Sequence, residues 1–381
     1  MIMMNKAMYA FSGDPITYGH IDIVERAAKA FDEVVVGIGV NPDKKYMFSL
    51  EERTDMAKRS LGHVRNIEIV AFKGLLVDYA YENCIPVIVK GVRDARDFDY
   101  EKLLHEMGES QKVGIETFVL YAKPELGKIS SSSVKAMMKE QGFIHEFVPL
   151  NVKQQLEARM LGQYIVGITG AIGAGKSYVS ERLVELGREN RIEVYNVELD
   201  NIGHQILSEL QEPRYKEVRK EIADKFGKEV QYESGEINRK ALGETVFNDL
   251  EKLQELNEIM LTPIMVRLRK ELKGKKGIVL LNAALLAEMN ITYLCNNNVI
   301  LVDVDPVGQE RRLSGRGLSA EQTRRRIGIQ YSTSEKRDKL YEAITKERYG
   351  QIWIIQNNDD SPGKEIESVF ERLVQEMMHE V

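Results

Sequence analysis

YIVGITGAIGAGKSYVSERLVEL, residues 164–186, joins three patterns that together predict one supersecondary unit. Residues 164–169 are apolar and rich in β-branched side chains, as in a buried strand. Residues 170–177 satisfy the pattern G-x-x-x-x-G-K-[ST], and the residues that follow have helical periodicity. Backbone N–H groups in such a loop converge on an anion at the helix N-terminus, so the stretch predicts a phosphate-binding loop.

Individual residues of this loop have separate expected roles. We expect the Lys176 ammonium to reach the β- and γ-phosphates of ATP, and the Ser177 hydroxyl to ligate Mg²⁺. Tyr178, in the first turn of the helix, belongs to the same predicted nucleotide site. Three glycines let the backbone approach the phosphates closely: Gly170, Gly173 and Gly175.

Charged residues beyond the loop extend the predicted site. Glu198 and Asp200 directly follow a predicted strand, and in an open parallel sheet that strand end borders the ligand crevice. Glu198 is a candidate magnesium ligand. Two interpretations of Asp200 stay open: it accepts the proton of an acceptor hydroxyl, or it only caps the next helix. Arg312 and Arg316 have guanidinium groups that suit phosphates, as do the arginines at 324–326, which also fit a solvated basic helix face.

Short β-branched segments alternate with helical patterns along the whole chain. Predicted strands span residues 7–11, 33–40, 66–70, 86–90, 116–121, 164–169, 193–197, 277–282, 299–304 and 352–355. Such alternation is typical of parallel sheets covered by helices. We therefore predict an α/β protein with two doubly wound parallel-sheet domains, residues 1–161 and residues 162–381.

Helical signals support this division. Ser49 and Glu52 have the spacing of a capping box at a helix start. A helix at residues 152–161 is expected to close the first domain, and Gly162 precedes the next strand. A long, charged helical stretch, about residues 200–273, separates the strands at 193–197 and 277–282.

Composition restricts the class of protein. Only Cys84 and Cys295 occur, so we expect no disulfide framework and a reducing compartment. We find no signal-peptide pattern, and the longest apolar run, residues 278–287, is shorter than the roughly 18 residues of a spanning helix. A net charge of −6 opposes nonspecific nucleic-acid binding. We therefore expect a cytoplasmic enzyme of small phosphorylated ligands, with no membrane segment and no nucleic-acid partner.

Two motifs in the first half predict a second anion site. Residues 11–20, FSGDPITYGH, lie between the first strand and the first helix, which places His20 in the first turn of that helix. There the helix N-terminus favours a phosphate and the imidazole can donate a hydrogen bond to it. Residues 129–135, ISSSSVK, offer hydroxyls at another helix N-terminus. Each motif alone fits an ordinary loop, and their joint presence favours a nucleotide site.

Together these motifs resemble the nucleotidyltransferase superfamily and, at finer grain, the bacterial type of phosphopantetheine adenylyltransferase, over about residues 6–160. The resemblance implies that ATP and 4′-phosphopantetheine form dephospho-CoA and pyrophosphate by direct in-line attack. It assigns Ser12 and His20 to the α-phosphate, and Lys44 to the incoming phosphate. The other implied ligands of ATP or the acceptor are Lys90, Arg93, Glu101, Ser130, Ser131 and Ser132. Leu75 and Leu76 are candidates for the pantetheine wall and fit core packing equally well.

The second half resembles dephospho-CoA kinase over essentially residues 163–381. The similarity rests on GAIGAGKS at 170–177, ELD at 198–200, NRKAL at 238–242, ALLAE at 284–288 and VDVDP at 302–306, with Gln309, Arg312 and Arg316. That family phosphorylates the ribose 3′-hydroxyl of dephospho-CoA with ATP and Mg²⁺. By analogy Asp200 is the base for that hydroxyl, while Arg312 and Arg316 hold phosphates.

Several positions depart from the two families. Phe11 and Gly13 stand in the reverse of the usual order, and Lys90 replaces a customary Arg. Gly108, Thr262 and Ala284 replace a customary Asn, His and Pro, respectively. These departures concern the acceptors more than the ATP sites.

The two resemblances imply consecutive reactions, the last two steps of coenzyme A synthesis. Expected ligands are ATP, 4′-phosphopantetheine, dephospho-CoA and, as a feedback ligand, coenzyme A, and we predict a homo-oligomer formed through the N-terminal domain. Two alternatives remain: a nucleotidyltransferase and kinase acting on other acceptors such as pyridine mononucleotides, or a fusion whose kinase half is impaired and regulatory.

Overall fold

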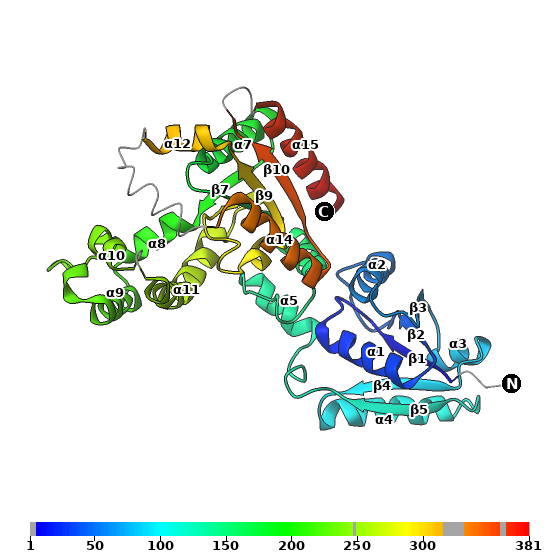
Figure 1. Ribbon diagram of the computed structural model, residues 1–381. Coiled ribbons are helices and arrows are strands. Elements are labelled where there is room, and N and C mark those ends of the chain that lie inside the picture. Colours follow the sequence, from blue (N-terminus) through cyan, green and yellow to red (C-terminus); the bar gives the residue numbers. More distant parts are fainter. Residues whose placement is uncertain (1–4, 247–248, 315–330, 359–362, 381) are drawn as a thin grey trace. The chain divides into compact units, whose positions relative to one another are not determined.

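The computed structural model describes residues 5–246, 249–314, 331–358 and 363–380. It divides into two compact units, Met1–Leu156 and Glu157–Val381 (Figure 1). The helix expected at residues 152–161 is α-helical only over α6, Leu150–Leu156, and continues as a π-helical turn, Glu157–Leu161. Within the described part of the chain, no helix is both long and apolar enough to cross a membrane.

A five-stranded parallel sheet forms the first unit, in the order β3-β2-β1-β4-β5. Its strands are β1 (Lys6–Phe11), β2 (Glu33–Ile38), β3 (Ile67–Ala71), β4 (Val87–Val92) and β5 (Glu116–Tyr121). The helices are α1 (Tyr18–Ala30), α2 (Leu50–Leu61), α3 (Leu76–Glu82), α4 (Ala95–Glu109), α5 (Ser131–Lys139) and α6. Strand order reverses beside β1, because β2 and β3 extend to one side and β4 and β5 to the other.

Alternating residues of the strands pack on opposite faces of this sheet. Met8 and Ile88 belong to a buried cluster that includes Ala80 of α3. On the other face α1 approaches so closely that a Cβ added to Gly91 would lie 2.9 Å from Cγ1 of Ile23. The sheet is therefore covered by helices on both faces, as a doubly wound fold requires.

A second five-stranded parallel sheet, in the order β10-β9-β6-β8-β7, forms the other unit. Its strands are β6 (Gln163–Gly170), β7 (Val194–Glu198), β8 (Gly277–Asn282), β9 (Asn298–Asp303) and β10 (Gln351–Gln356). Helices α7 (Lys176–Asn190) and α15 (Gly363–Glu380) bury their apolar residues in one cluster with β6, β8, β9 and β10. Within the described residues, the sheet region also contains helices α12 (Pro306–Ser314) and α14 (Thr333–Glu347).

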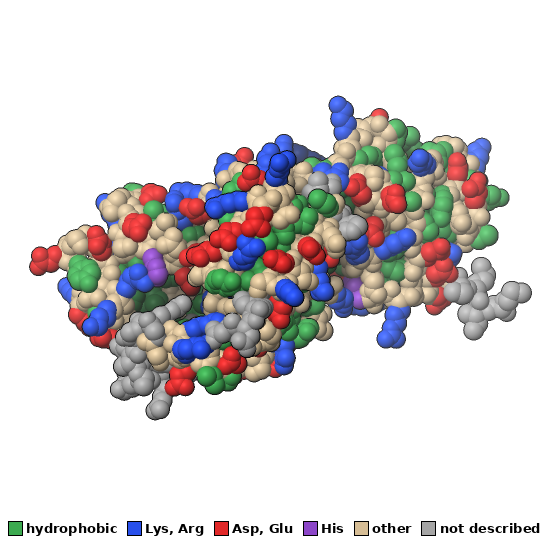
Figure 2. All heavy atoms as spheres, turned by 90° about the horizontal axis from the view of Figure 1, so that it is seen from above, with side chains coloured by type: hydrophobic (Ala, Val, Ile, Leu, Met, Phe, Trp, Pro, Cys, Tyr) green, Lys and Arg blue, Asp and Glu red, His purple; other side chains and the backbone are tan. Residues whose placement is uncertain are grey.

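The charged stretch expected at residues 200–273 is a sequence of separate helices. These are α8 (Leu199–Ser208), α9 (Pro213–Phe226), α10 (Arg239–Val246) and α11 (Leu250–Leu272), with a 3₁₀ turn at Lys228–Val230. Pro213 begins α9 because its missing N–H is no loss in a first helical turn. Figure 2 shows Lys and Arg side chains interspersed with Asp and Glu over the face that it presents.

The strand predictions agree closely with the structure. Residues 116–121 and 277–282 match β5 and β8, and the other predicted bounds differ from the observed ones by about one or two residues. The capping box of α2 is also present: Ser49 Oγ accepts from the Glu52 N–H at 3.1 Å, and the Glu52 carboxylate accepts from the Ser49 N–H at 2.7 Å.

Candidate active sites

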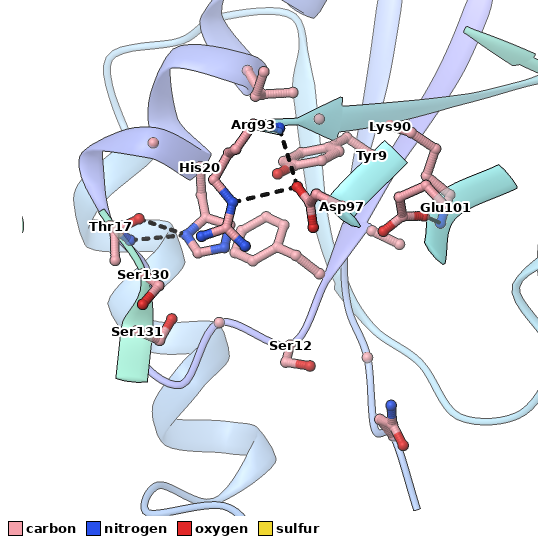
Figure 3. Close-up of a pocket in the computed structure, with 18 of the residues that line it drawn as sticks. Tyr9, Ser12, Thr17, His20, Lys90, Arg93, Asp97, Glu101, Ser130 and Ser131 are labelled. Atoms are coloured by element: carbon pink, nitrogen blue, oxygen red, sulfur yellow. Dashed lines mark hydrogen bonds and ion pairs between the residues drawn. The ribbon is translucent and has the colours of Figure 1, made fainter. Parts of the chain in front are cut away.

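A cavity of about 440 Å³ opens at the carboxyl ends of β1 and β4, where the strand order of the first sheet reverses. Ligands bind at this point of open α/β sheets because the loops there diverge. The cavity brings together most residues predicted for the first site (Figure 3). They are Ser12, His20, Lys44, Leu76, Lys90, Arg93, Glu101, Ser130, Ser131 and Ser132.

His20 is held as a neutral hydrogen-bond donor. It is the third residue of α1, and its Nδ1 accepts the backbone N–H of Thr17 at 3.1 Å. The ring proton therefore resides on Nε2. Burial, assisted by the positive charges of Arg93 and Lys44, lowers the pKa of His20 to about 4. At neutral pH the imidazole thus offers one N–H without carrying a charge.

Three cationic side chains line the same cavity. Lys44 Nζ lies 3.4 Å from Ser12 Oγ, and Lys90 forms an ion pair with Glu101 at 2.7 Å. Arg93 donates from Nη1 to the Ile129 carbonyl at 3.1 Å, which ties the end of β4 to the serine loop. Its Nε contacts the Asp97 carboxylate at 3.3 Å (Figure 3). Glu101 and Asp97 line the cavity as well, so its charged side chains amount to three positive and two negative groups, an excess of one positive charge toward a polyphosphate.

The serine loop begins α5, as the sequence predicts, with Ser130 as the N-cap. Ser130 Oγ accepts the Ser133 N–H at 3.0 Å, so this hydroxyl stabilises the helix end. Ser131 Oγ donates to the Pro15 carbonyl at 2.8 Å and connects α5 to the loop after β1. The helix N-terminus consequently faces the same cavity as His20.

Asp14 and Lys135 form an ion pair beside this site, although no role was predicted for either residue. The Asp14 carboxylate pairs with Lys135 Nζ at 2.6 Å and accepts the Phe48 N–H at 3.0 Å. Asp14 is 6% exposed, so this charge depends on its partners. Both residues belong to the two motifs, but opposite charges so far apart in sequence give no local signal of a pair.

Leu75 and Leu76, the two candidates for the pantetheine wall, differ in the cavities that they line. Leu76 lines the first cavity and also a neighbouring, mostly apolar one of about 220 Å³. Leu75 lines only the second of these, and its side chain is 57% exposed. Lys90 and Leu104 line both cavities, so the two are adjacent. Gly108 lines the apolar cavity, where the resembled family has an Asn.

The glycine loop of the second unit follows β6 and begins α7, as predicted. A Cβ added to Gly170 would lie 2.3 Å from the Val302 carbonyl oxygen, and one added to Gly175 would lie 2.1 Å from Asn357 Nδ2. Gly175 also has a left-handed backbone, with φ of +88°. Lys176 Nζ donates to the Gly170 carbonyl at 3.1 Å, so its ammonium folds over the loop.

Residues after β9 and β10 support this loop from outside. Arg312 donates to the Ala174 carbonyl at 3.2 Å and to the Asn357 carbonyl at 2.7 Å. Gln309 Nε2 donates to the Ile172 carbonyl at 2.8 Å. The structure thus brings Arg312 to the phosphate loop, as the sequence predicts. Arg316 and the arginines at 324–326 lie outside the described residues.

Asp200 is not a helix cap. The N-cap of α8 is Glu198, and Asp200 lies in the first turn with its side chain accessible to solvent, so the capping interpretation is wrong. Surrounding protein raises the pKa of Asp200 by desolvation, and the positive charge of Lys176 partly opposes this rise. A carboxylate with a raised pKa is a stronger proton acceptor, as a catalytic base needs to be.

Buried Lys336 lies close enough to influence Asp200. It forms an ion pair with Glu288 and donates to the Ala284 carbonyl at 2.7 Å. Burial lowers the pKa of Lys336, and the charges of Glu288 and Asp200 oppose that effect. Ala284, where the resembled family has Pro, is therefore held through its backbone carbonyl.

The donors expected for Mg²⁺ are hard oxygens. Ser177 is exposed in the first turn of α7, and Glu198 is exposed at the end of β7. Among the described residues no group of three or more His, Cys, Asp and Glu side chains has the arrangement of a metal site. Such a set is unnecessary for a magnesium ion that arrives with nucleotide, because phosphates and water supply most of its ligands.

The fold defines a class: two α/β nucleotide-binding domains in one chain, each with a candidate anion site where its central strand ends. Comparison with known families identifies each of the two domains more narrowly. Residues 12–137 match the family described as cytidylyltransferase-like, and residues 164–347 match the family described as dephospho-CoA kinase. The chain therefore contains a cytidylyltransferase-like domain followed by a dephospho-CoA kinase domain.

Two solved structures are also similar to this chain. The crystal structure of TT1252 from Thermus thermophilus has 25% identity and a TM-score of 0.42, over 56% of this chain and 97% of that one. The crystal structure of NadR protein in complex with NR has 11% identity and a TM-score of 0.32, over 98% of this chain and 96% of that one. These TM-scores are too low to establish a fold or a substrate.

Proposed function

We propose that this chain catalyses two consecutive ATP-dependent reactions, the last two steps of coenzyme A synthesis. The first domain adenylylates 4′-phosphopantetheine to dephospho-CoA and pyrophosphate, and the second phosphorylates the ribose 3′-hydroxyl of dephospho-CoA. The observation that carries the proposal is the dephospho-CoA kinase domain joined to a nucleotidyltransferase site. The product of the first proposed reaction is the acceptor of the second.

Adenylyl transfer in the first cavity needs alignment and charge stabilisation. An acceptor phosphate oxygen attacks the α-phosphorus of ATP in line, the bond to the β-phosphate oxygen breaks, and pyrophosphate leaves. His20 Nε2–H donates to the crowded α-phosphate, and Lys44, 3.4 Å from Ser12 Oγ, bridges the incoming phosphate to that centre. Ser131, Ser132 and the N-terminus of α5 hold the β- and γ-phosphates. No covalent enzyme intermediate is required.

Acceptor choice is assigned to the adjoining apolar cavity. Lys90 lines both cavities, so it can hold the acceptor phosphate while an extended arm passes Leu76 toward Leu75. A long, thin, weakly polar arm such as pantetheine suits this mostly apolar lining, whereas a pyridine nucleoside leaves it unfilled. Coenzyme A carries the same arm, which supports its proposed role as a feedback ligand of this site.

Phosphoryl transfer in the second domain uses the glycine loop. Lys176 and Arg312 neutralise the phosphates of ATP. The hydroxyl oxygen of the acceptor attacks the γ-phosphorus, Asp200 accepts the hydroxyl proton, and ADP leaves. Ser177 and Glu198 would hold Mg²⁺, which when bound offsets phosphate charge. Tyr178, 50% exposed beside the loop, is placed to contact nucleotide.

Exposed apolar side chains on the first domain support the predicted homo-oligomer. Helix α4 buries no residue, and β5 is an edge strand. Five large hydrophobic side chains there are 39–68% exposed: Phe98, Leu103, Met107, Phe118 and Tyr121. A solvated monomer seldom leaves so many large apolar side chains uncovered, so we propose that copies of this domain associate through α4 and the edge strand β5.

The acceptor is tested by measuring pyrophosphate release from ATP with one acceptor at a time. We expect release with 4′-phosphopantetheine and background release with nicotinamide or nicotinate mononucleotide. Preference for a mononucleotide would favour the alternative nucleotidyltransferase and kinase. If release occurs but the second domain binds ATP without phosphorylating dephospho-CoA, the kinase half is regulatory, as the replacements at Thr262 and Ala284 would allow.

A further inference from the structure

Arg53 of α2 is a buried cation that joins the ends of two strands beside the first cavity. Its side chain is 1% exposed. Nη1 donates to the Ser12 carbonyl after β1 and to the Gly39 carbonyl, at 2.9 Å, after β2. The residues lining the cavity include Ser12 and Gly39 but not Arg53. Arg53 therefore reaches the site through the backbone that carries Ser12.

Tyr46 extends this connection to the loop that carries Lys44. The Arg53 guanidinium carbon lies 4.0 Å from the centroid of the Tyr46 ring, a cation–π arrangement. Tyr46 Oη accepts the Asn41 N–H at 2.6 Å. The Asn41 carbonyl in turn accepts the Lys44 N–H at 3.1 Å, and the Asn41 side chain accepts the Asp43 N–H at 2.9 Å.

These contacts close a ring around the reacting centre. Lys44 Nζ lies 3.4 Å from Ser12 Oγ. The Ser12 carbonyl accepts a hydrogen bond from Arg53, which completes the ring. We propose that Arg53 and Tyr46 are positioning residues that hold Lys44 opposite Ser12 for adenylyl transfer. This inference rests on the proposed function of the first domain. Lys44 is exposed, so fixing it in the transition state costs conformational entropy. Because the backbone turn that carries Lys44 is already ordered, less of that cost remains when the reaction occurs.

Tyr46→Phe is the sharpest test, because it retains the ring over Arg53 and removes only the hydroxyl. The hydroxyl accepts the Asn41 N–H at 2.6 Å and donates to the Asn41 carbonyl at 3.4 Å, so both bonds are lost. We expect kcat for adenylyl transfer to fall by about fivefold, with KM for ATP nearly unchanged. Tyr81→Phe, at an exposed tyrosine of α3, is the matched control and should leave kcat unchanged. In a Lys44→Ala background, Tyr46→Phe should cost nothing further, because Tyr46 acts through that lysine.

Hydrogen exchange supplies a readout that is independent of the acceptor. The backbone amides of Asn41, Asp43 and Lys44 should exchange about fivefold faster in Tyr46→Phe, while those of α2 keep wild-type rates. Arg53→Lys, which cannot reproduce the guanidinium contacts, should loosen the same amides more; if that variant does not fold, Tyr46→Phe decides. Unchanged exchange, or losses in kcat that add to those of Lys44→Ala, would overturn the proposal. Absence of transfer by wild-type protein would instead contradict the proposed function alone.

Discussion

The Phe11 ring stacks on the imidazole of His20, with ring centroids 4.5 Å apart and an interplanar angle of 17°. Phe11 also packs beside Gly13, where an added Cβ would lie 3.3 Å from its ring. The exchange of Phe and Gly relative to the resembled family is therefore compensated in space. Phe11 fills the room beside Gly13 and covers the ring that is expected to face the α-phosphate.

Removing this cover should change the acidity of His20. In Phe11→Ala, water reaches the imidazole, so its pKa should rise from about 4 toward the ordinary 6.5. Titration of the imidazole protons by nuclear magnetic resonance measures the shift. Phe98→Ala, at an exposed helix position, is the control. A His20 pKa that stays near 4 in Phe11→Ala would show that the ring does not desolvate His20.

The same depressed pKa predicts how stability depends on pH. Between about 6.5 and about 4 the unfolded chain binds a proton at His20 that the folded chain does not, so the free energy of unfolding falls as the pH is lowered through this window. Denaturant titrations of wild type and His20→Gln test this. The difference in stability between the two should shrink as pH falls; a constant difference would contradict a neutral His20.

His20→Ala should separate catalysis from binding in the first domain. Loss of the Nε2–H donor is expected to slow adenylyl transfer by roughly 10²–10³-fold, because the donor acts on charge that develops in the transition state. ATP affinity, measured by calorimetry, should stay close to wild type, and so should phosphorylation of added dephospho-CoA. A loss of ATP binding as large as the loss of rate would assign His20 to ground-state binding.

Lys176→Ala should have the converse effect. Phosphorylation of dephospho-CoA is expected to disappear, while pyrophosphate release by the first domain continues at the wild-type rate. The two assays on one preparation provide their own control, since a folding defect of the whole chain would lower both. Loss of both activities in well-folded protein would refute independent sites.

Gly175 should tolerate no side chain. In Gly175→Ala the methyl group would meet Asn357 Nδ2, so we expect loss of ATP affinity and a lower melting temperature. Gly235→Ala is a matched control, because Gly235 has a similar φ, +87°, with open space around it. Positive φ alone costs Ala roughly 1–2 kcal/mol. Equal effects of the two substitutions would mean that the Asn357 contact does not restrict the loop.

Local pattern was sufficient to predict the two sheets, and most residues predicted for the first site line one cavity. Residues 277–282, for example, form a strand, because short segments with β-branched and other apolar residues, bounded by glycine and polar residues, favour an extended backbone. Long-range pairs were not predictable: Asp14 with Lys135, and Arg53 with Tyr46, depend on loops brought together by the sheet. The role of Asp200 was left open because a carboxylate near a helix start is the same pattern whether it caps or catalyses.

The central claim is tested most directly by identifying products from one incubation. Purified chain is mixed with 4′-phosphopantetheine, ATP and Mg²⁺, and products are followed by mass spectrometry over time. We expect dephospho-CoA to form first and then to convert to coenzyme A, with release of pyrophosphate and ADP. Persistence of unmodified phosphopantetheine while a pyridine mononucleotide is adenylylated under the same conditions would contradict the account.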